Sequence, residues 1–230
     1  MHVSDLRDQE KRAAAQRGVT YIENGMAIGL GSGSTSAFAI EFLGERVRAG
    51  LDIRAVPTSS RTERLAIREG IPLIGLAEAP ELDLTIDGAD ELDPSLHLIK
   101  GGGGALLREK VVASASRRLI IIADHTKQVP VLGAFPLPVV VTPFAAAFVA
   151  RRIGELGATA EFRLDDRREP FVTDDSGYIL DCRFGQIPDP PALARELDRL
   201  PGVVEHGLFI DIASVVIVAN GESVTELRRP

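Results

Sequence analysis

The residues Gly25-Met-Ala-Ile-Gly-Leu-Gly31-Ser-Gly-Ser-Thr35 predict a short buried strand that enters a glycine-rich turn. The apolar spacing that follows predicts a helix over 34–49. Glycines allow backbone N–H groups to approach an anion, and a helix N-terminus adds about half a positive charge. The hydroxyls of Ser34 and Thr35 can donate further hydrogen bonds. We therefore interpret the turn as a phosphate-binding segment for a ligand smaller than a nucleotide.

Two nucleotide-binding turns do not fit this segment. Ser34 stands where the dinucleotide fingerprint has its third glycine, and no Lys-Ser/Thr pair follows at the spacing of a P-loop. A purely structural turn, in which Ser34 or Thr35 caps the helix, is the alternative interpretation.

The alternation of strand and helix continues on both sides of this turn. We expect strands over 51–56, 71–76, 82–86 and 119–123, and helices over 4–23, 58–69 and 105–117. Strands that alternate with helices predict an α/β fold, a mostly parallel Rossmann-like sheet with helices on both faces.

The pattern changes at Phe135-Pro-Leu-Pro138. We expect strands at 139–141 and 203–208, helices at 143–156 and 191–200, and a hairpin that joins 171–173 to 178–181 through Asp174-Asp-Ser-Gly177. This β-α-β-β-α-β order predicts a smaller ferredoxin-like α+β domain. The apolar tail 209–218 should return to the first sheet. The predicted organisation is a main α/β catalytic domain over 1–131 plus 207–230, and a small domain over 132–206 inserted before the last strand.

Composition limits the function classes. Thirty-three acidic residues against 26 basic ones give a net charge of −7, which argues against nucleic acid as a partner. One cysteine, Cys182, cannot form an internal disulfide, which fits a reducing cytosol. The charged first residues lack the apolar core of a signal peptide, and no apolar run is long enough to span a bilayer. We therefore expect a cytoplasmic protein with no membrane partner.

The segment Asp87-Gly-Ala-Asp-Glu-Leu-Asp93 follows a predicted strand. Ligands of open α/β sheets bind beyond the carboxyl ends of the strands, so Asp87 and Asp90 can point into one cleft and shuttle protons. A divalent-metal site is a second interpretation, although His97 alone does not complete a recognised ligand cluster. Plain turn chemistry is the third.

Two further segments that should lie near strand ends each carry a lysine. Only four of the 26 basic residues are lysine, namely Lys11, Lys100, Lys110 and Lys127. Where arginine is the default cation, a retained lysine suggests that a compact ammonium is required. Lys100 precedes four glycines and a helix that carries Glu109, while Lys127 follows Asp124-His125-Thr126 at a strand end. A single histidine such as His125 is more often structural at a strand end, and Lys11 by itself fits a surface position.

The order and spacing of these segments resemble the type A ribose-5-phosphate isomerase family. The matching residues run nearly from end to end: Gly29-Leu-Gly-Ser-Gly-Ser-Thr35, Pro57-Thr-Ser59, Asp87-Gly-Ala-Asp90, Lys100-Gly-Gly-Gly103 through Arg108-Glu109-Lys110, Ala123-Asp124 with Lys127-Gln128, Phe135-Pro-Leu-Pro138, Pro201-Gly-Val-Val204 and Gly207-Leu-Phe209. The resemblance implies reversible conversion of D-ribose 5-phosphate to D-ribulose 5-phosphate in the non-oxidative pentose phosphate pathway. It also implies a homo-oligomer, usually a dimer or a dimer of dimers, and no metal or organic cofactor.

The resemblance also assigns roles by position. Glu109 matches the family's proton-transferring base, and we expect Asp87, Asp90 and Lys100 to assist it as catalytic residues. The implied substrate-binding residues are Lys11, Ser32, Gly33, Ser34, Thr35, Asp87, Gly88, Ala89, Asp90, Lys100, Gly101, Gly102, Gly103 and Lys127. Ser32 stands where threonine is common, and His125 occupies a variable position, which argues against a catalytic role for this histidine.

Two other classes remain as alternatives. A sugar-phosphate-sensing regulator could share the fold, but the segment before the first strand is too short for a helix-turn-helix domain. A coenzyme A transferase could use Glu109 as a nucleophile, and an amino-sugar-phosphate deaminase is a further related enzyme. The paired Asp87 and Asp90 with Lys100 suit proton transfer better.

Overall fold

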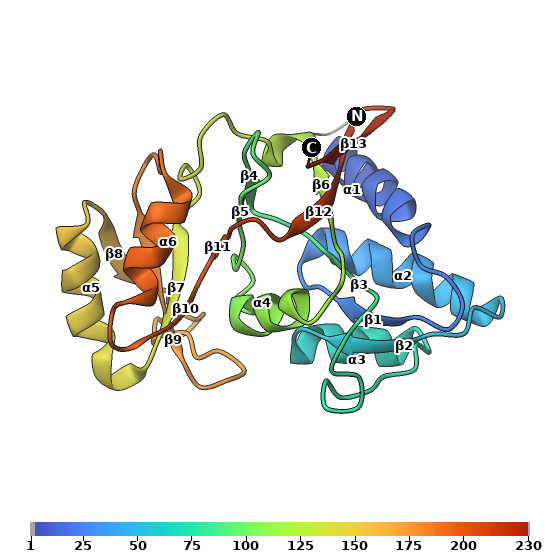
Figure 1. Cartoon of the computed structure of the whole chain (residues 1–230), viewed down its shortest axis with the longest axis horizontal. Helices are drawn as coiled ribbons and strands as arrows, with labels where there is room; N and C mark the ends of the chain where they lie inside the picture. Colours follow the sequence, from blue (N-terminus) through green and yellow to red (C-terminus); the bar gives the residue numbers. More distant parts are fainter. Residues whose placement is uncertain (1–2, 230) are drawn as a thin grey trace. The chain divides into compact units, whose positions relative to one another are not determined.

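The computed structural model describes residues 3–229, and the chain divides into two compact units (Figure 1). Unit 1 holds the residues up to Ala89, then Arg108–Lys127, then the residues from Ile212 onward. Unit 2 holds Asp90–Leu107 and Gln128–Asp211. Each unit has its own sheet and its own apolar core.

Unit 1 is built on a six-stranded sheet of order β13-β12-β6-β3-β1-β2. Its strands are β1 (Ala27–Leu30), β2 (Arg54–Pro57), β3 (Leu84–Asp87), β6 (Leu119–Asp124), β12 (Ala213–Asn220) and β13 (Ser223–Arg228). All neighbouring strands are parallel except β13, which runs antiparallel to β12. The mostly parallel sheet predicted from the sequence is confirmed.

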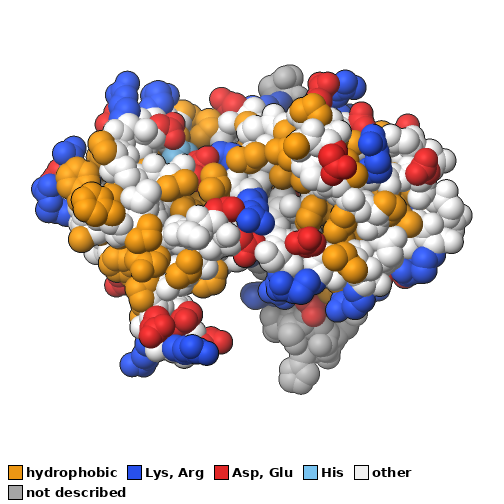
Figure 2. Space-filling view, turned by 90° about the horizontal axis from the view of Figure 1, so that it is seen from below, with side chains coloured by type: hydrophobic (Ala, Val, Ile, Leu, Met, Phe, Trp, Pro, Cys, Tyr) orange, Lys and Arg blue, Asp and Glu red, His pale blue; other side chains and the backbone are white. Residues whose placement is uncertain are grey.

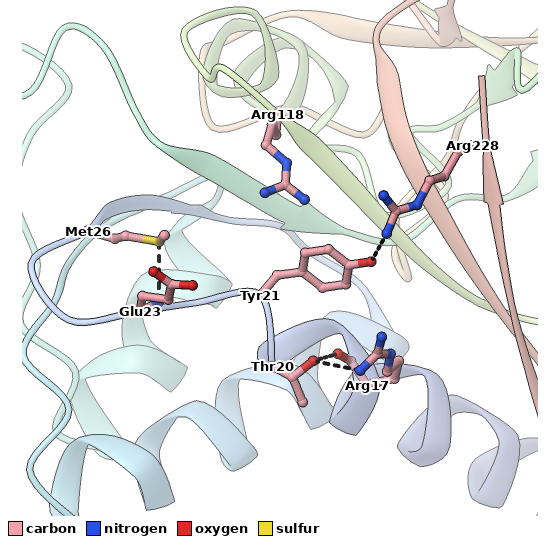
Figure 3. Close-up of a pocket in the computed structure, with 7 residues that line it drawn as sticks. All are labelled: Arg17, Thr20, Tyr21, Glu23, Met26, Arg118 and Arg228. Carbon is pink, nitrogen blue, oxygen red and sulfur yellow. Dashed lines mark hydrogen bonds between the residues drawn. The ribbon is translucent and has the colours of Figure 1, made fainter. Parts of the chain in front are cut away.

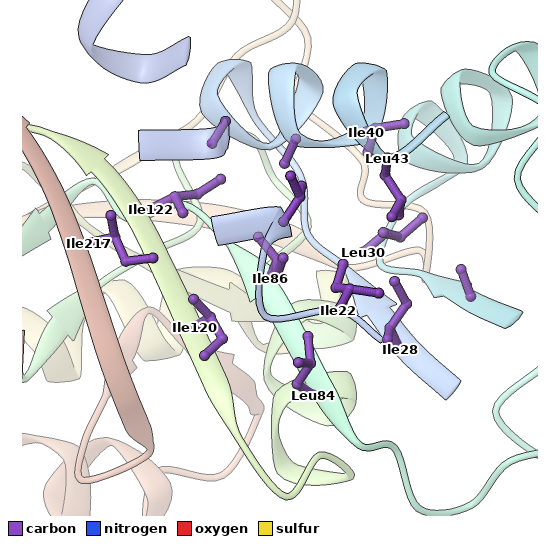
Figure 4. Packing of buried hydrophobic residues seen from close by; sticks show 14 of the residues in the cluster. Ile22, Ile28, Leu30, Ile40, Leu43, Leu84, Ile86, Ile120, Ile122 and Ile217 are labelled. Carbon is purple, nitrogen blue, oxygen red and sulfur yellow. The ribbon is translucent and has the colours of Figure 1, made fainter. Parts of the chain in front are cut away.

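Helices cover both faces of this sheet. On one face, α1 (Val3–Val19) and α2 (Ser34–Arg48) pack against each other and onto the strands. Figure 4 shows the core beneath them, where isoleucine and leucine side chains from the helices meet those of the strands. On the other face, Val112 of α4 (Leu106–Ser114) packs with Val56 and Leu82. The remaining helix, α3 (Ser60–Arg68), begins at Ser59, whose side chain accepts a hydrogen bond from the Thr62 N–H.

Unit 2 contains a four-stranded antiparallel sheet of order β10-β7-β9-β8. Its elements in chain order are β7 (Leu137–Val141), η2 (Pro143–Ala145), α5 (Ala146–Glu155), β8 (Thr159–Phe162), β9 (Tyr178–Arg183), α6 (Pro190–Asp198) and β10 (Val203–His206). This β-α-β-β-α-β order confirms the ferredoxin-like small domain. A second, three-stranded sheet joins β11 (Leu208–Phe209), β5 (Leu98–Ile99) and β4 (Glu91–Leu92).

Two of the expected strands were wrong. Residues 71–76 make a single bridge, between Leu73 and Ala55. Pro72 has no N–H with which to extend the pairing before Leu73, and Gly75 is an unfavourable strand residue after Ile74. Residues 171–173 likewise form only a bridge, Val172 to Tyr178, and β8 pairs with β9 in their place.

The C-terminal part of the chain returns to the first sheet as β12, which confirms the expectation for the tail 209–218, and it adds one strand that the sequence did not suggest. Two strands, β12 and β13, follow unit 2, since residues 223–228 fold back as a hairpin on β12. Residues 90–107 group with unit 2. The expected domain limits, 1–131 plus 207–230 and 132–206, stay a prediction. The two compact units are defined by contacts within the folded chain, and such contacts do not test whether each part folds on its own. Within residues 3–229, no helix combines the length and apolar character needed to span a bilayer.

Candidate active site

The strand order of unit 1 reverses between β1 and β3, since the chain continues from β1 to β2 on one side and from β3 to β6 on the other. Open α/β sheets bind ligands at such a point, beyond the carboxyl ends of the strands. Gly31 directly follows β1, and its N–H donates to the Ile86 carbonyl at 2.8 Å. A Cβ at position 31 would lie 2.0 Å from Oδ1 of Asp87, so only glycine leaves room for that carboxylate.

Asp87 ends β3 and is 1% exposed. Its Oδ1 accepts hydrogen bonds from the N–H groups of Ser32 at 3.0 Å and Gly88 at 2.7 Å, and from the Ser36 hydroxyl at 3.3 Å. These donors fix the turn between β1 and α2 around the carboxylate. Ser36 is a partner that sequence reasoning missed, because a serine inside a helix carries no signal of its own.

Glu109 lies in the first turn of α4 and is 3% exposed. The Ser32 hydroxyl donates a hydrogen bond to its Oε1. Ser32 therefore joins the two predicted acidic groups, since its N–H binds Asp87 and its hydroxyl binds Glu109. A buried carboxylate held in one orientation at the strand-order reversal has the placement of a general base.

The start of α2 tests the capping role that the structural interpretation of the glycine-rich turn gives to Ser34 or Thr35. Gly33, at φ 96°, is the N-cap residue, and no side chain caps the helix. The expectation that Ser34 or Thr35 caps it is therefore wrong. Without a capping side chain, the first N–H groups of α2 stay available for an anion.

Unit 2 carries the second group of predicted residues. Oδ2 of Asp90 accepts a hydrogen bond from the Gly102 N–H at 2.7 Å, and a Cβ on Gly102 would lie 2.6 Å from Oδ1 of the same carboxylate. Asp90 thus binds the backbone of the four-glycine segment, and the glycine is required for this approach.

Arg163 holds the same glycine segment from outside. Its guanidinium donates to the carbonyls of Gly101 at 2.9 Å and Gly102 at 3.1 Å, and it makes a two-pronged ion pair with Asp181. The Arg163 side chain is only 15% exposed. Sequence reasoning missed this residue, because one arginine among 22 does not stand out.

Lys100 is 2% exposed. Its backbone N–H donates to the Gly207 carbonyl at 2.9 Å, and its ammonium lies 5.3 Å from the centre of the Phe209 ring. The ring face partly compensates the loss of water around the ammonium. Lys100 thus places a buried amino group against the ring of Phe209, and a positive charge at this position would stabilise a developing negative charge.

The two remaining predicted lysines lie in unit 1. Lys11 is on α1 with 18% of its side chain exposed, so it is not an ordinary surface lysine, and it pairs with Asp8 at 3.3 Å. Lys127 ends the single turn η1 (His125–Lys127) after β6. Within residues 3–229, Lys127 makes no ion pair with a carboxylate. His125 begins the same turn, and its Nδ1 is 2.8 Å from Oε2 of Glu10, which supports the structural interpretation of this histidine.

The metal interpretation of the segment from Asp87 to Asp93 finds no support in the described residues, where those carboxylates form no cluster of ligating atoms. Asp93 instead binds backbone N–H groups within its own turn and lies 3.2 Å from Nδ1 of His97. The convergence expected for Asp87 and Asp90 stays a prediction, since they belong to different units.

A surface pocket of about 420 Å³ lies elsewhere on unit 1 (Figure 3). Arg118 and Arg17 lie over the ring of Tyr21 at 5.0 and 5.7 Å, and Arg228 donates to the Tyr21 hydroxyl. The Tyr21 hydrogen bond is the main cause that lowers the pKa of Glu226. Arg118 precedes β6 and Tyr21 precedes β1, so this pocket is at the amino ends of the parallel strands, away from the strand-order reversal.

The fold is that of an α/β protein with a buried acidic side chain at the strand-order reversal, which is the arrangement expected of an enzyme that acts on a small ligand. Comparison with known proteins identifies the family. The family model described as ribose 5-phosphate isomerase A (phosphoriboisomerase A) matches residues 54–223. The ribose-5-phosphate isomerase A of Parvibaculum lavamentivorans is 55% identical over 219 residues, covering 93% of this chain and 95% of that protein.

Solved structures agree with this result. A D-ribose-5-phosphate isomerase in complex with phospho-erythronic acid has a TM-score of 0.94 and 39% identity, covering 97% of this chain and 99% of that one. The ribose 5-phosphate isomerase A of Methanocaldococcus jannaschii has a TM-score of 0.92 and 40% identity, covering 96% and 99%. This chain belongs to the ribose-5-phosphate isomerase A family and is an isomerase.

Proposed function

We propose that this chain interconverts D-ribose 5-phosphate and D-ribulose 5-phosphate through an enediolate, with Glu109 as the base. The reaction moves a proton between two adjacent carbons, so one base must take the C2 proton and return it to C1. The single observation that supports Glu109 most is its burial at 3% exposure beside the Ser32 hydroxyl, which fixes the carboxylate. Such a base is worth about 10²–10⁴-fold in rate.

Lys100 is the proposed partner for the negative charge that develops on the substrate oxygen. A preorganised cation acts more strongly in a site without water, and the buried ammonium of Lys100 needs little rearrangement. The N–H groups of Gly101 and Gly103 are proposed to bind substrate oxygens alongside it, while the Gly102 N–H is held by Asp90. Asp87 and Asp90 are proposed to exchange hydroxyl protons during ring opening.

The phosphate group has a separate set of proposed partners. A phosphate ester carries about −1.5 to −2 charges, and a chain of net charge −7 repels it on average. Lys11, Lys127 and the start of α2 at Gly33–Thr35 supply the local positive potential. Binding at this end of the substrate aligns its carbon atoms with the base, which is proximity catalysis.

The proposal is tested by incubating the purified protein with ribose 5-phosphate in the presence of EDTA and measuring ketopentose phosphate. We expect conversion in EDTA, because every proposed role falls on a side chain or backbone group. Glu109→Gln should bind substrate and lose turnover by at least about a hundredfold.

A matched control is Glu63→Gln, since Glu63 occupies the first turn of α3 as Glu109 occupies that of α4, but is exposed. Full turnover by Glu109→Gln would exclude the base role. No conversion by the folded wild-type protein would exclude the reaction. Phospho-erythronic acid is a suitable inhibitor, because its phosphate and carboxylate imitate the two charged ends of the enediolate.

We also propose a cytoplasmic homo-oligomer, a dimer or a dimer of dimers. Several apolar side chains of unit 2 are exposed, including Phe144 at 100% and Phe148 at 42%, and Figure 2 shows apolar side chains gathered on its surface (left). Large exposed apolar groups are typical of subunit interfaces. Light scattering at several concentrations tests the assembly, and a monomer at every concentration would contradict it. The cytoplasmic location rests on the metabolic family and the buried, single Cys182.

A further inference from the structure

Glu10 is a fully buried acidic residue that the proposed reaction does not use. It lies on α1 and is 0% exposed. Oε1 accepts the N–H of Gly221 at 2.8 Å, and Oε2 lies 2.8 Å from Nδ1 of His125. Burying a carboxylate costs free energy of desolvation unless the group is hydrogen-bonded. A fully buried glutamate therefore suggests a specific structural role.

The Glu10 carboxylate joins three segments that are far apart in the sequence. It extends from α1, contacts η1 through His125, and binds the turn between β12 and β13 through Gly221. Both α1 and η1 also pack against β12. The two residues of the Glu10–His125 hydrogen bond therefore lie on elements that pack against the same strand.

The two proposed phosphate-binding lysines adjoin the two ends of this bond. Lys11 follows Glu10 directly on α1, and Lys127 is two residues after His125 in η1. The turn η1 has three residues and no buried side chain, and inside it the N–H and hydroxyl of Thr126 bind the preceding Asp124. The bond from His125 to Glu10 thus anchors the short turn that carries Lys127 to the helix that carries Lys11.

A metal site is the competing explanation, because the ligating atoms of Glu10, Asp124 and His125 lie within 4.8 Å of one another. The hydrogen bonds argue against it. Oε1 of Glu10 accepts a hydrogen bond from Gly221, and Oε2 of Glu10 is hydrogen-bonded to Nδ1 of His125. Oδ1 of Asp124 accepts a hydrogen bond from Thr126. A metal would have to replace these bonds.

We propose that Glu10 and His125 are positioning residues that hold Lys11 and Lys127 at the separation needed to bind one phosphate group. The inference rests on the proposed function, because it assigns the phosphate of the substrate to these lysines. Two ammonium groups on separate elements bind one anion more tightly when their spacing is set before binding, because less freedom is lost on binding. Substrate would then replace Asp8, which is 59% exposed, as the partner of Lys11.

The test compares His125→Ala with His125→Asn, whose side-chain amide can donate to Glu10 from near the position of Nδ1. His125→Ala should raise KM for ribose 5-phosphate about tenfold, the effect of losing one hydrogen bond to a charged group, and leave kcat unchanged. The inhibition constant of inorganic phosphate should rise by the same factor. His125→Asn should bring KM and the inhibition constant back close to their wild-type values. A role of His125 in packing alone would not produce this recovery, because asparagine is smaller than histidine.

Glu10→Gln is the second variant, because its carbonyl keeps an acceptor for one N–H while its charge is removed. Circular dichroism confirms that each variant is folded. Asp198→Ala is the matched control, since it removes the carboxylate that lies 3.1 Å from Nε2 of His206 in unit 2, and it should leave both constants unchanged.

The outcomes separate the two proposals. If the wild-type protein does not convert ribose 5-phosphate, the proposed function fails, and ³¹P NMR titration of wild type and His125→Ala with inorganic phosphate still tests the positioning. Equal phosphate affinity of folded wild type and folded His125→Ala would overturn it. Tight binding of Zn²⁺ or Mn²⁺ that requires His125 would also overturn it in favour of a metal site.

Discussion

A single methyl group at position 31 would displace a predicted catalytic carboxylate. The Cβ of an alanine would lie 2.0 Å from Oδ1 and 2.1 Å from Cγ of Asp87. Neither atom can move without breaking the hydrogen bonds that Oδ1 accepts from Ser32 and Gly88.

We therefore expect Gly31→Ala to destabilise the fold by about 1–3 kcal/mol, the usual cost of overpacking, and to lower kcat by more than it changes KM. Urea unfolding and steady-state kinetics measure the two effects. Gly154→Ala is the control, since a Cβ at that position in α5 meets no atom within 4 Å and a helical alanine is favoured. Wild-type stability and kinetics in Gly31→Ala would show that the turn can rearrange around Asp87.

Glycines whose role depends on backbone geometry could be identified from the sequence, as could the acidic residues and lysines beside them. Gly31, Gly101 and Gly102 stand in segments where glycine is unusual enough to be noticed. Arg163, Ser36 and Glu10 could not be found in this way, because each acts through a partner more than 40 residues away or through a helix position that any polar residue can occupy. Their roles depend on tertiary contacts, and spacing along the chain does not encode these.

At the scale of elements, Arg163 binds the carbonyls of the four-glycine segment, while Asp90 binds one of its N–H groups. Glycines have more backbone freedom than other residues, and an ordered glycine segment loses correspondingly more entropy. Arg163 opposes this freedom by binding the carbonyls of Gly101 and Gly102 while Asp181 fixes the guanidinium.

Arg163→Lys keeps the charge and loses the planar fork, so we expect faster amide hydrogen exchange at 101–104 and turnover reduced about tenfold. Arg183→Lys on β9 is the control, because that arginine is exposed and pairs only at 3.9 Å with Glu161. If exchange at 101–104 is unchanged in Arg163→Lys, the segment is held by Asp90 and its own turn.

Elements with strong periodicity were predicted well, and short elements were not. The order β-α-β-β-α-β of the small domain and the parallel strands of the main sheet follow from helical spacing and from continuous apolar runs that extend over whole segments. The two-residue strands β4, β5 and β11 are too short to show a period. The hairpin strand β13 reads Ser-Val-Thr-Glu-Leu-Arg, which is mostly polar because it is an exposed edge strand.

At the scale of the whole molecule, the only cysteine reports on global unfolding. Cys182 lies in β9 with 0% exposure, and burial raises the pKa of its thiol to about 12. An unfolded cysteine loses its proton near pH 8.5, as the ordinary pKa of about 8.5 requires. Between these values the unfolded chain binds fewer protons than the folded one, so this group favours unfolding as the pH rises.

We expect iodoacetamide to leave the folded protein unmodified at pH 8 and to alkylate it in concentrated urea, because the thiolate is the reactive form. Mass spectrometry after timed quenching measures the modified fraction. Substantial labelling of the native protein within minutes would mean that β9 opens locally, and Cys182→Ala provides the blank. The composition alone could not predict this result, since it gives the number of cysteines and not their burial.

The position of β12 in the sheet has a consequence for biosynthesis. This strand covers one edge of β6, yet it is encoded after the whole of unit 2. A ribosome that adds about 5–20 residues each second needs roughly 5–20 s to translate from residue 124 to residue 220. Throughout that interval the nascent polypeptide carries Leu119–Ile122 as an unpaired apolar edge, the kind of surface that holdase chaperones shield. Premature termination before residue 213 should therefore yield an aggregating product.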